Sequence, residues 1–382
     1  MFERLQLFIL TLLAYLLLPF SRVRSRPTAK GRPSILIVQT GKIGDLVCTT
    51  PVFRAIKKTW PEADLGVAVT SLVAPLLAGN PYVDVVFALN GKPGLAGKFR
   101  LIREIRRHGY HWVLVLTPAA IGVIIGVLAG IPNRALTVIP QLSRHTRSAL
   151  IFANRYVPYE LRAAGAEHYC RMVNLVGSVD CREPRELFPD AAARAKAEQF
   201  LAAHGIGADV FVVGISVAAG KFNKEWPAER FGALADRFIE QYGARIVWVG
   251  SSGDASTIAE AEAAMRRRDR AVSSAGAFTL AELSALLGRL KLFVSVDTGP
   301  LYMADAMGVP VVDIAGPADV RSQAPAGRAL VIQADGIPPL LTLMAAPDSS
   351  ERDPAIIAIT VDQVWREIEA FISREGLASV LP

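Results

Sequence analysis

The sequence predicts an α/β protein with two doubly wound domains, each built around a parallel sheet. Short apolar runs rich in β-branched residues alternate with helical patterns along the chain. A polar stretch with two prolines, residues 181–189, interrupts the alternation, which then starts again. The length of 382 residues also exceeds that of one ordinary domain. We therefore expect domains over residues 34–185 and 186–382, with a central cleft between them for ligands.

The predicted strands are short runs rich in β-branched residues and apolar over most of their length, which is typical of strands buried on both faces. They are residues 35–39, 65–69, 83–89, 112–116 and 135–139 in the first domain, and 210–216, 245–250, 292–296 and 310–315 in the second. The segment 119–130 is apolar all round and predicts a buried helix. Second-domain helices are expected at residues 190–204, 228–242, 255–268, 280–287 and 301–307. A closing helix is expected around Trp365, and packing against the first domain is one option for it.

The N-terminal segment 5–20 reads LQLFILTLLAYLLLPF and carries no charge. As a helix its sixteen residues would span about 24 Å, less than the roughly 30 Å of a bilayer core. Arg22, Arg24 and Arg26 follow, which suits anionic lipid. We predict an apolar membrane-associated helix with a basic linker over residues 1–33, either spanning the membrane or lying in one leaflet. A cleaved signal peptide and a helix packed on the protein itself are the alternatives.

Composition excludes several classes of protein. Apolar residues make up 52% of the chain and charged residues 20%, so it is not disordered. The net charge of +7 is spread along the chain, and no nucleic-acid partner is expected. Cys48, Cys170 and Cys181 offer no plausible disulfide framework, which favours a reducing compartment. Five scattered histidines show no metal-ligand spacing, so a zinc enzyme is not expected. The small number of cysteines likewise argues against a small secreted scaffold.

The first loop that could carry chemistry is residues 39–45, QTGKIGD, directly after the first predicted strand. Gly41 and Gly44 allow a sharp turn and a close approach to a ligand. The loop is neither a Walker A motif nor GxGxxG. Asp45 has two possible roles, capping the helix that follows or acting as a general base at the floor of the cleft.

The second loop, residues 216–227, follows the first strand of the second domain and is basic and polar. Lys221 and Lys224 beside backbone N–H groups would attract a phosphate, although a solvated surface loop is the alternative.

The third loop follows a strand at residue 296 and contains Asp297, Thr298 and Gly299, which begin a short helix of small residues. Such a helix N-terminus suits an anion or a sugar, while a simple helix cap is the alternative for Asp297. Asp254 sits where an acid could hold ribose hydroxyls, or where it merely starts a helix. The sequence contains no Asp-x-Asp pair, so no metal-chelated diphosphate is expected.

The three loops lie in the segments GKIGDLVCTTPVFRAIKKTWP, KFNKEWPAERF and DTGPLYMADAMGVPVVDIAGP. Together these resemble glycosyltransferase family 9, the heptosyltransferase-like enzymes of lipopolysaccharide synthesis, over residues 34–375. The resemblance implies a GT-B fold with an acceptor-binding first domain and a nucleotide-sugar-binding second domain. It implies inverting transfer without metal or cofactor, from a nucleotide-diphosphate sugar, typically ADP-heptose, to a lipid-linked saccharide. The expected location is the cytoplasmic face of the bacterial inner membrane.

The resemblance also implies roles for individual residues. Asp45 matches the proposed general base and Lys224 a lysine that contacts phosphate. Residues 297–299 match the segment that contacts the donor, and Asp254 loosely matches an acidic ribose contact. The chain departs from the family in having Tyr302 where a histidine is usual, and a phenol can still donate to a phosphate or hydroxyl.

A second departure is Asp305, which replaces a residue that is usually small.

Two other functions remain open at this point. One is a nucleotide-sugar 2-epimerase, which needs neither an acceptor nor a membrane. The other is a non-catalytic member of the same fold that binds a glycolipid or serves as a scaffold.

Overall fold

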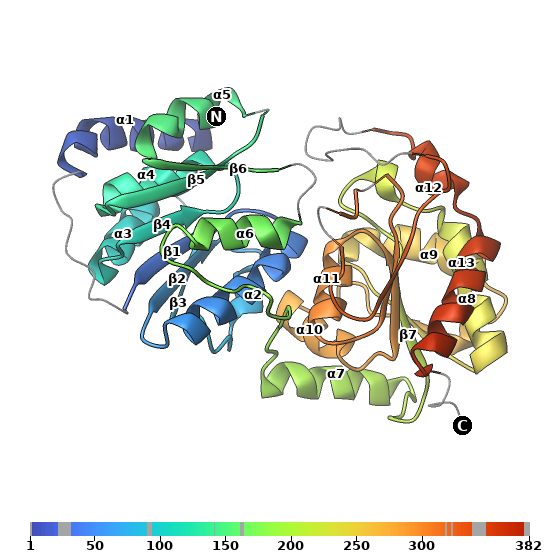
Figure 1. The fold of residues 1–382 in the computed structure, drawn as a ribbon. Coiled ribbons are helices and arrows are strands. Elements are labelled where there is room, and N and C mark those ends of the chain that lie inside the picture. Colours follow the sequence, from blue (N-terminus) through green and yellow to red (C-terminus); the bar gives the residue numbers. More distant parts are fainter. Residues whose placement is uncertain are drawn as a thin grey trace. The chain divides into compact units, whose positions relative to one another are not determined.

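The computed structural model describes residues 2–21, 32–89, 94–140, 142–160, 164–317, 319–321, 324–337 and 349–377. The chain divides into two compact units, unit 1 over Met1–Glu183 and unit 2 over Pro184–Pro382. Each unit contains a parallel sheet covered by helices, and the predicted α/β class with two parallel sheets is confirmed (Figure 1).

The sheet of unit 1 has the strand order β3-β2-β1-β4-β5-β6, and every neighbouring pair is parallel. Its strands are β1 (Ser34–Gln39), β2 (Asp64–Val69), β3 (Val85–Ala88), β4 (Trp112–Val115), β5 (Asn133–Val138) and β6 (Arg155–Pro158). Its α-helices are α1 (Phe2–Ser21), α2 (Ile43–Thr59), α3 (Gly94–His108), α4 (Ala120–Ala129), α5 (Arg144–Ser148) and α6 (Gly165–Val173), with 3₁₀ turns η1 (Ala74–Leu77) and η2 (Ala149–Phe152). The apolar segment 119–130 forms the buried helix α4, as predicted.

The sheet of unit 2 has the order β12-β11-β10-β7-β8-β9 and is also parallel throughout. Its strands are β7 (Val212–Ser216), β8 (Arg245–Trp248), β9 (Ala271–Ser273), β10 (Leu292–Val296), β11 (Val311–Ile314) and β12 (Ala329–Ile332). Its helices are α7 (Ala191–Ala203), α8 (Ala228–Tyr242), α9 (Ala255–Ala263), α10 (Leu280–Leu287), α11 (Gly299–Ala306), α12 (Pro354–Ala358) and α13 (Val361–Arg374), with 3₁₀ turns η3 (Phe222–Lys224), η4 (Ser252–Asp254) and η5 (Arg268–Arg270).

The C-terminal helix α13 packs against α8 and β12 of unit 2. Its apolar face follows the helical period, and Val364, Ile368 and Phe371 are fully buried in the core of that unit. The helix therefore belongs to unit 2 both in sequence and in packing.

Both sheets reverse their strand order once, and this fixes where ligands can bind. In unit 1 the chain runs outward through β1, β2 and β3 and returns at β4 beside β1, and in unit 2 it returns at β10 beside β7. Connections leave the two central strands in opposite directions there, which opens a crevice at their carboxyl ends. The loops after β1 and β4, and after β7 and β10, are therefore the expected binding loops of the two units.

The structure corrects the expectation that the N-terminal segment could span a membrane, and α1 instead shows the alternative of packing on the protein itself. Over the described residues, no helix is long and apolar enough to cross a membrane. Instead α1 packs along α4 and η2, where Leu10 is 1% exposed and Ala14 is fully buried in the core of unit 1. The Tyr15 ring meets the Phe152 ring edge-on, with centroids 4.7 Å apart. One side of the apolar segment is thus used by the protein itself, while most of the predicted basic linker, residues 22–31, lies outside the described residues.

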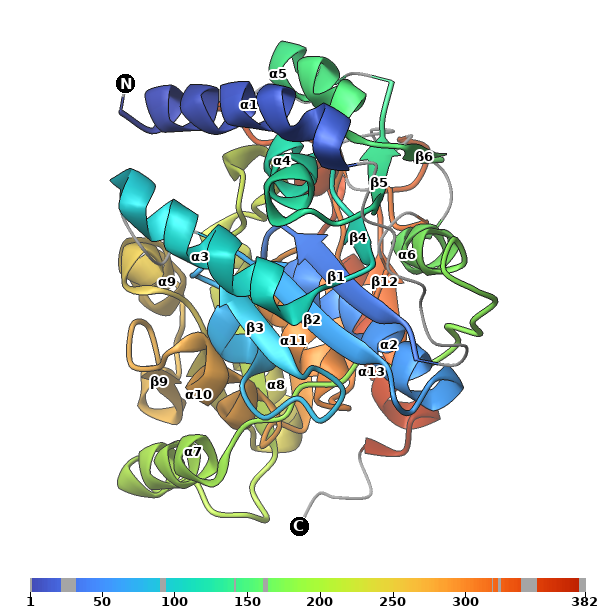
Figure 2. The ribbon, with the colours of Figure 1, turned by 90° about the vertical axis from the view of Figure 1, so that its left-hand side faces the viewer.

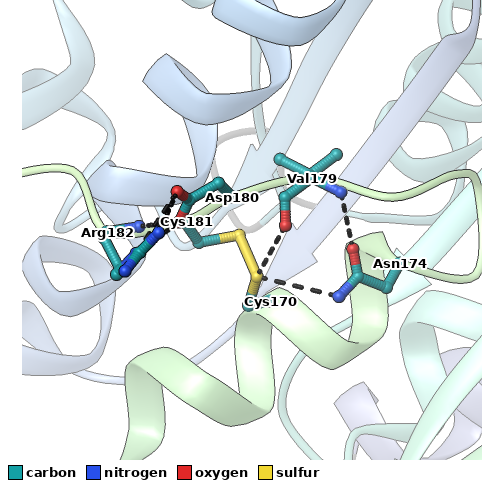
Figure 3. The surroundings of a disulfide bond; sticks show 6 residues. All are labelled: Cys170, Asn174, Val179, Asp180, Cys181 and Arg182. Atoms are coloured by element: carbon teal, nitrogen blue, oxygen red, sulfur yellow. Dashed lines mark hydrogen bonds and ion pairs between the residues drawn. A yellow bond between two sulfur atoms is a disulfide. The ribbon is translucent and has the colours of Figure 1, made fainter.

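The structure also corrects the prediction that the cysteines form no disulfide. Cys170 of α6 and Cys181 are bonded, with Cα atoms 5.8 Å apart (Figure 3). The chain folds back after α6, and the Asn174 side-chain oxygen accepts a hydrogen bond of 2.8 Å from the Val179 N–H. The spacing of eleven residues between the two cysteines did not indicate this turn. With the disulfide present, the argument from cysteine usage for a reducing compartment no longer holds.

Candidate active site

Lys224 and Asp297 are brought together where the strand order of unit 2 reverses. Lys224 ends the turn η3 after β7, and Asp297 directly follows β10, the strand beside β7. Their side chains form an ion pair in which the lysine is 13% exposed and the aspartate 16%. A charged pair that is largely withdrawn from water at a strand-end crevice can contact an anionic ligand directly.

Tyr302, which stands where the resemblance predicts a histidine, completes this cluster. It lies on α11, is 2% exposed, and its hydroxyl donates a hydrogen bond of 2.6 Å to Asp297 Oδ1. The Arg185 guanidinium lies over the Tyr302 ring, 5.5 Å from its centroid. The phenol therefore orients the Asp297 carboxylate, a contact that the sequence alone did not predict.

Asp305, the second departure from the family pattern, has a structural partner. Its Oδ2 accepts hydrogen bonds from Arg185 at 2.8 Å and from the Ala326 N–H at 2.9 Å, and its Oδ1 accepts one from the Gly327 N–H at 2.8 Å. Both charged side chains of the Arg185–Asp305 pair are buried. Asp305 thus holds Arg185 in place over Tyr302, and the two departures from the family belong to one contact network.

Thr298 and Gly299 form the start of α11 beside the ion pair. Thr298 is the N-cap residue in an extended conformation, and Gly299 and Pro300 begin the helix. Both Thr298 and Gly299 are half-buried. The first N–H groups of a helix have no partner within the helix, so this end can add hydrogen bonds to an anion held at Lys224.

Asp313 on β11 was missed by the sequence analysis. It is fully buried, and burial, with the nearby Asp297 carboxylate as a second cause, raises its pKa well above the usual value, while Lys224 acts in the opposite direction. Its Oδ1 has no hydrogen-bond partner in the part of the chain that the structure describes. An aspartate inside the apolar run VVDI was the available signal.

The loop before Lys224 is braced by two further residues that the sequence analysis did not single out. Glu225 Oε1 accepts a hydrogen bond of 3.1 Å from the Ala219 N–H, and burial raises the pKa of this carboxyl. The Arg352 guanidinium lies 4.6 Å from the centroid of the Phe222 ring and donates to the Glu225 carbonyl. Lys221, a predicted phosphate contact, is half-buried at the N-cap of η3.

Asp254 holds its own loop, and among the described residues it forms no hydrogen bond or ion pair with the Lys224 cluster. Its Oδ2 accepts hydrogen bonds from the Ser251 N–H at 2.7 Å and from the Ser251 hydroxyl at 2.8 Å. These contacts close the turn η4 after β8, which matches the helix-start alternative. A ribose contact for Asp254 stays a prediction.

In unit 1 the carboxylate of Asp45 folds back on its loop. Its Oδ2 accepts a hydrogen bond of 2.8 Å from the N–H of Lys42, the N-cap residue of α2. A Cβ at Gly41 would lie 2.5 Å from that same oxygen, so only glycine fits there. Gly44 is buried in the first turn of α2. The helix-capping role of Asp45 is thus present, and a role as base stays a prediction.

The surroundings of Asp45 come from α6 and β1. Tyr169 of α6 is buried, and burial together with the nearby Asp45 carboxylate raises the pKa of its phenol well above the usual value. The Gln39 amide donates to Thr49 Oγ1 at 2.9 Å, and its oxygen accepts from the Gly41 N–H at 3.1 Å. The loop is therefore held from both sides.

Within the described ranges, no group of three or more histidine, cysteine, aspartate or glutamate side chains could hold a metal ion.

Comparison with known proteins adds the following. A family model described as Glycosyltransferase family 9 (heptosyltransferase) matches residues 98–337. Lipopolysaccharide heptosyltransferase 3 of Escherichia coli is 24% identical over 283 residues, which cover 72% of this chain and 81% of that protein.

Two solved structures share the fold. The glycosyl transferase family 9 protein from Veillonella parvula is 21% identical and has a TM-score of 0.77, with 92% of this chain and 100% of that chain covered. The ADP-heptose lps heptosyltransferase II of E. coli is 20% identical and has a TM-score of 0.71, with 90% of this chain and 99% of that chain covered.

Proposed function

Because this chain belongs to glycosyltransferase family 9, we propose that it transfers a heptose or similar sugar from a nucleotide-diphosphate donor to a lipid-linked saccharide of the bacterial envelope. As a family member it is a glycosyltransferase of the lipopolysaccharide heptosyltransferase type. ADP-heptose is our first choice of donor, since the name of one structural relative contains it.

The observation that carries the proposal is the Lys224–Asp297–Tyr302 cluster beside the N-terminus of α11. A donor diphosphate needs a cation and N–H donors at one place. Lys224 supplies the cation, which it would share with Asp297, and the start of α11 supplies the N–H groups. Lys221 and Thr298 lie in the same two loops and are the next candidates for the donor contact.

We assign the chemical step to two groups. Asp45 of unit 1 removes the proton from the acceptor hydroxyl while that oxygen attacks the anomeric carbon on the face opposite the diphosphate, which inverts the configuration. The bond to the diphosphate breaks, and Lys224 with the N–H groups of α11 stabilises the charge of the leaving group without a metal. The assignment of Asp45 rests on the family resemblance of its loop and on its half-buried position.

The outer face of α1 supports a place on a membrane surface. Leu5, Phe8, Leu12 and Leu16 recur at helical spacing and are 52–63% exposed, although they are large and apolar. Such a face can lie in the interface of a lipid bilayer without crossing it. We propose that the protein works at the cytoplasmic face of the bacterial inner membrane, where a lipid-linked acceptor would be available.

The donor assignment is tested by titrating ADP-heptose into the purified protein by calorimetry in a buffer with EDTA. We expect binding in the wild type and a dissociation constant at least tenfold larger for Lys224→Met, because the phosphate loses its cation. Lys196→Met, on the exposed face of α7, is the matched control and should bind like the wild type. Equal affinity in both variants would remove Lys224 from the site.

A further inference from the structure

A cavity of about 260 Å³ lies at the carboxyl ends of three strands of unit 1. Thr40, Thr70 and Leu89 directly follow β1, β2 and β3 and line it. Ligands of α/β proteins bind at this edge of the sheet. The cavity is slightly smaller than the roughly 300–1,000 Å³ of ordinary small-molecule sites, so it suits one part of a larger ligand.

The walls of the cavity are apolar and come from three helices that lie together on one side of the sheet (Figure 2). Leu10 of α1, Leu101 of α3 and Ile125 of α4 are almost completely buried, and Ile121 of α4 is half-buried. The space is open to solvent on one side, so its apolar walls are in contact with water when no ligand covers them. Walls of this kind fit a hydrocarbon chain.

One charged side chain lines the same space. Lys98 of α3 is half-buried, and across the described residues no carboxylate forms an ion pair with it. A lysine at an apolar site attracts an anionic group at the end of a chain that fills the site. The hydroxyls of Thr40 and Thr70 can add hydrogen bonds to such a group.

The cavity also connects two features already described. Leu10 on its wall belongs to α1, whose opposite face is exposed and apolar. Thr40 is the neighbour of Gly41, in the loop that leads to Asp45. A chain in this cavity would therefore lie between the proposed membrane-facing helix and the proposed catalytic loop.

We propose that the cavity binds one hydrocarbon chain of a phosphorylated lipid, whose phosphate pairs with Lys98. The chain can come from the lipid of the acceptor or from a phospholipid of the bilayer, since both present the same chemistry. In either case the inference deepens the proposed function and rests on it for its biological meaning, but chain binding is measured without any sugar transfer.

The first experiment titrates the full-length protein with alkyl phosphates from hexyl to dodecyl, each below its micelle concentration, by calorimetry. Burial of one methylene contributes about 0.8 kcal/mol, so each added methylene should tighten binding about fourfold until the cavity is full. Decyl glucoside, with the same chain as decyl phosphate and no charge, should bind more weakly. Equal affinity for hexyl and dodecyl phosphate would overturn the proposal.

Matched variants locate the binding. Ile121→Phe places a larger side chain in the cavity and should weaken the binding of decyl phosphate at least tenfold. Ile151→Phe, at an exposed position of η2, should leave this binding unchanged. Lys98→Gln should weaken the binding of decyl phosphate about tenfold and leave the binding of decyl glucoside unchanged. Arg100→Gln, on an exposed part of α3, should change neither affinity. Lys98→Gln needs no repacking of the core, so it keeps the test valid if Ile121→Phe does not fold.

Two further arms identify the source of the chain. A chain from the acceptor predicts that Ile121→Phe raises KM for the lipid-linked acceptor but not for a deacylated, water-soluble one. A chain from the bilayer predicts that Ile121→Phe weakens sedimentation with anionic vesicles and leaves both KM values unchanged. Binding that depends on chain length in a protein without transferase activity would contradict the proposed function alone. Binding that ignores both Ile121→Phe and Lys98→Gln would contradict the cavity alone.

Discussion

The carboxylate of Asp45 can hold its loop or remove a proton, and a single substitution separates the two roles. In Asp45→Asn an amide oxygen can still accept the hydrogen bond from the Lys42 N–H. Turnover should fall at least a hundredfold, because an amide cannot act as the base and a general base contributes about 10²–10⁴-fold. Initial rates with ADP-heptose and a saccharide acceptor measure this, and calorimetry with the donor is the control. More than about a tenth of wild-type turnover would leave Asp45 with the capping role alone.

His168 should make the protein sensitive to mild acid. It is fully buried on α6, and its Nε2 lies 2.8 Å from Thr137 Oγ1, while burial lowers its pKa from 6.5 to about 4. Below pH 6.5 the His168 side chain becomes protonated in the unfolded chain, whereas in the folded protein it becomes protonated only near pH 4. Stability is therefore complete above pH 6.5 and declines as the pH falls toward 4, by about 3 kcal/mol for this group.

Urea unfolding of the wild type and of His168→Gln at pH 7, 6 and 5 tests this expectation. Glutamine can still donate to Thr137 but does not titrate, so the loss of stability toward acid should be smaller in the variant. The same decline in both proteins would mean that His168 is not the group responsible.

At the level of residues, the sequence predicted the loops of the site better than their contacts. Lys224 and Asp297 could be found because each follows an apolar strand at a predictable edge of the sheet. Their ion pair, 73 residues apart in sequence, could not, and neither could the Arg185–Asp305 pair, 120 residues apart. Partners so distant in the chain are set by tertiary packing, of which a single sequence holds no direct record.

At the level of elements, strands in the middle of the sheets were predicted and edge strands were mostly missed. β6, β9 and β12 each lie at an edge of a sheet and were not predicted. Edge strands are short and partly exposed, and β6 is mainly exposed along its length. The apolar run that marks a buried strand is absent from β6 and β9, because only a strand with neighbours on both sides and helices on both faces needs it. β12 does have such a run, ALVI, and was not recognised.

The two faces of α1 should respond differently to substitution. Leu10→Ala on the buried face should lower the free energy of unfolding by about 2–5 kcal/mol, since Leu10 belongs to the core of unit 1. Leu12→Ala on the 52% exposed face should leave stability nearly unchanged and weaken sedimentation with anionic vesicles. Urea unfolding and a vesicle sedimentation assay on the same preparations measure the two effects.

Removal of residues 1–31 is the larger version of this test. A polar, basic linker separates the segment from the first strand, and on that ground alone the truncated protein would be expected to fold. The packing of α1 on α4 instead predicts a lower melting temperature, because the removal uncovers the apolar surface of α4. A truncated protein that melts like the full chain would show that the contact between α1 and α4 contributes nothing to stability.

For the whole molecule, binding of the nucleotide should slow hydrogen exchange in unit 2 rather than in unit 1. Hydrogen exchange of the full chain with saturating ADP should slow at residues 217–224 and 297–299, the two loops around the Lys224–Asp297 pair. The reason is that a bound diphosphate holds these N–H groups and suppresses local opening. Protection restricted to residues 40–45 of unit 1 would place the nucleotide in the wrong unit and contradict the assignment of the donor loops.

The bond between Cys170 and Cys181 turns the chain between them into a closed covalent ring. A single backbone cut inside this ring leaves the protein in one piece, although the same cut elsewhere would divide it. The ring closes just before the boundary between the units, at Glu183 and Pro184. After a cut in the ring, most of unit 1 and all of unit 2 stay joined covalently through the disulfide alone. The redox state of the surroundings, rather than the protease, then decides whether the enzyme remains one molecule.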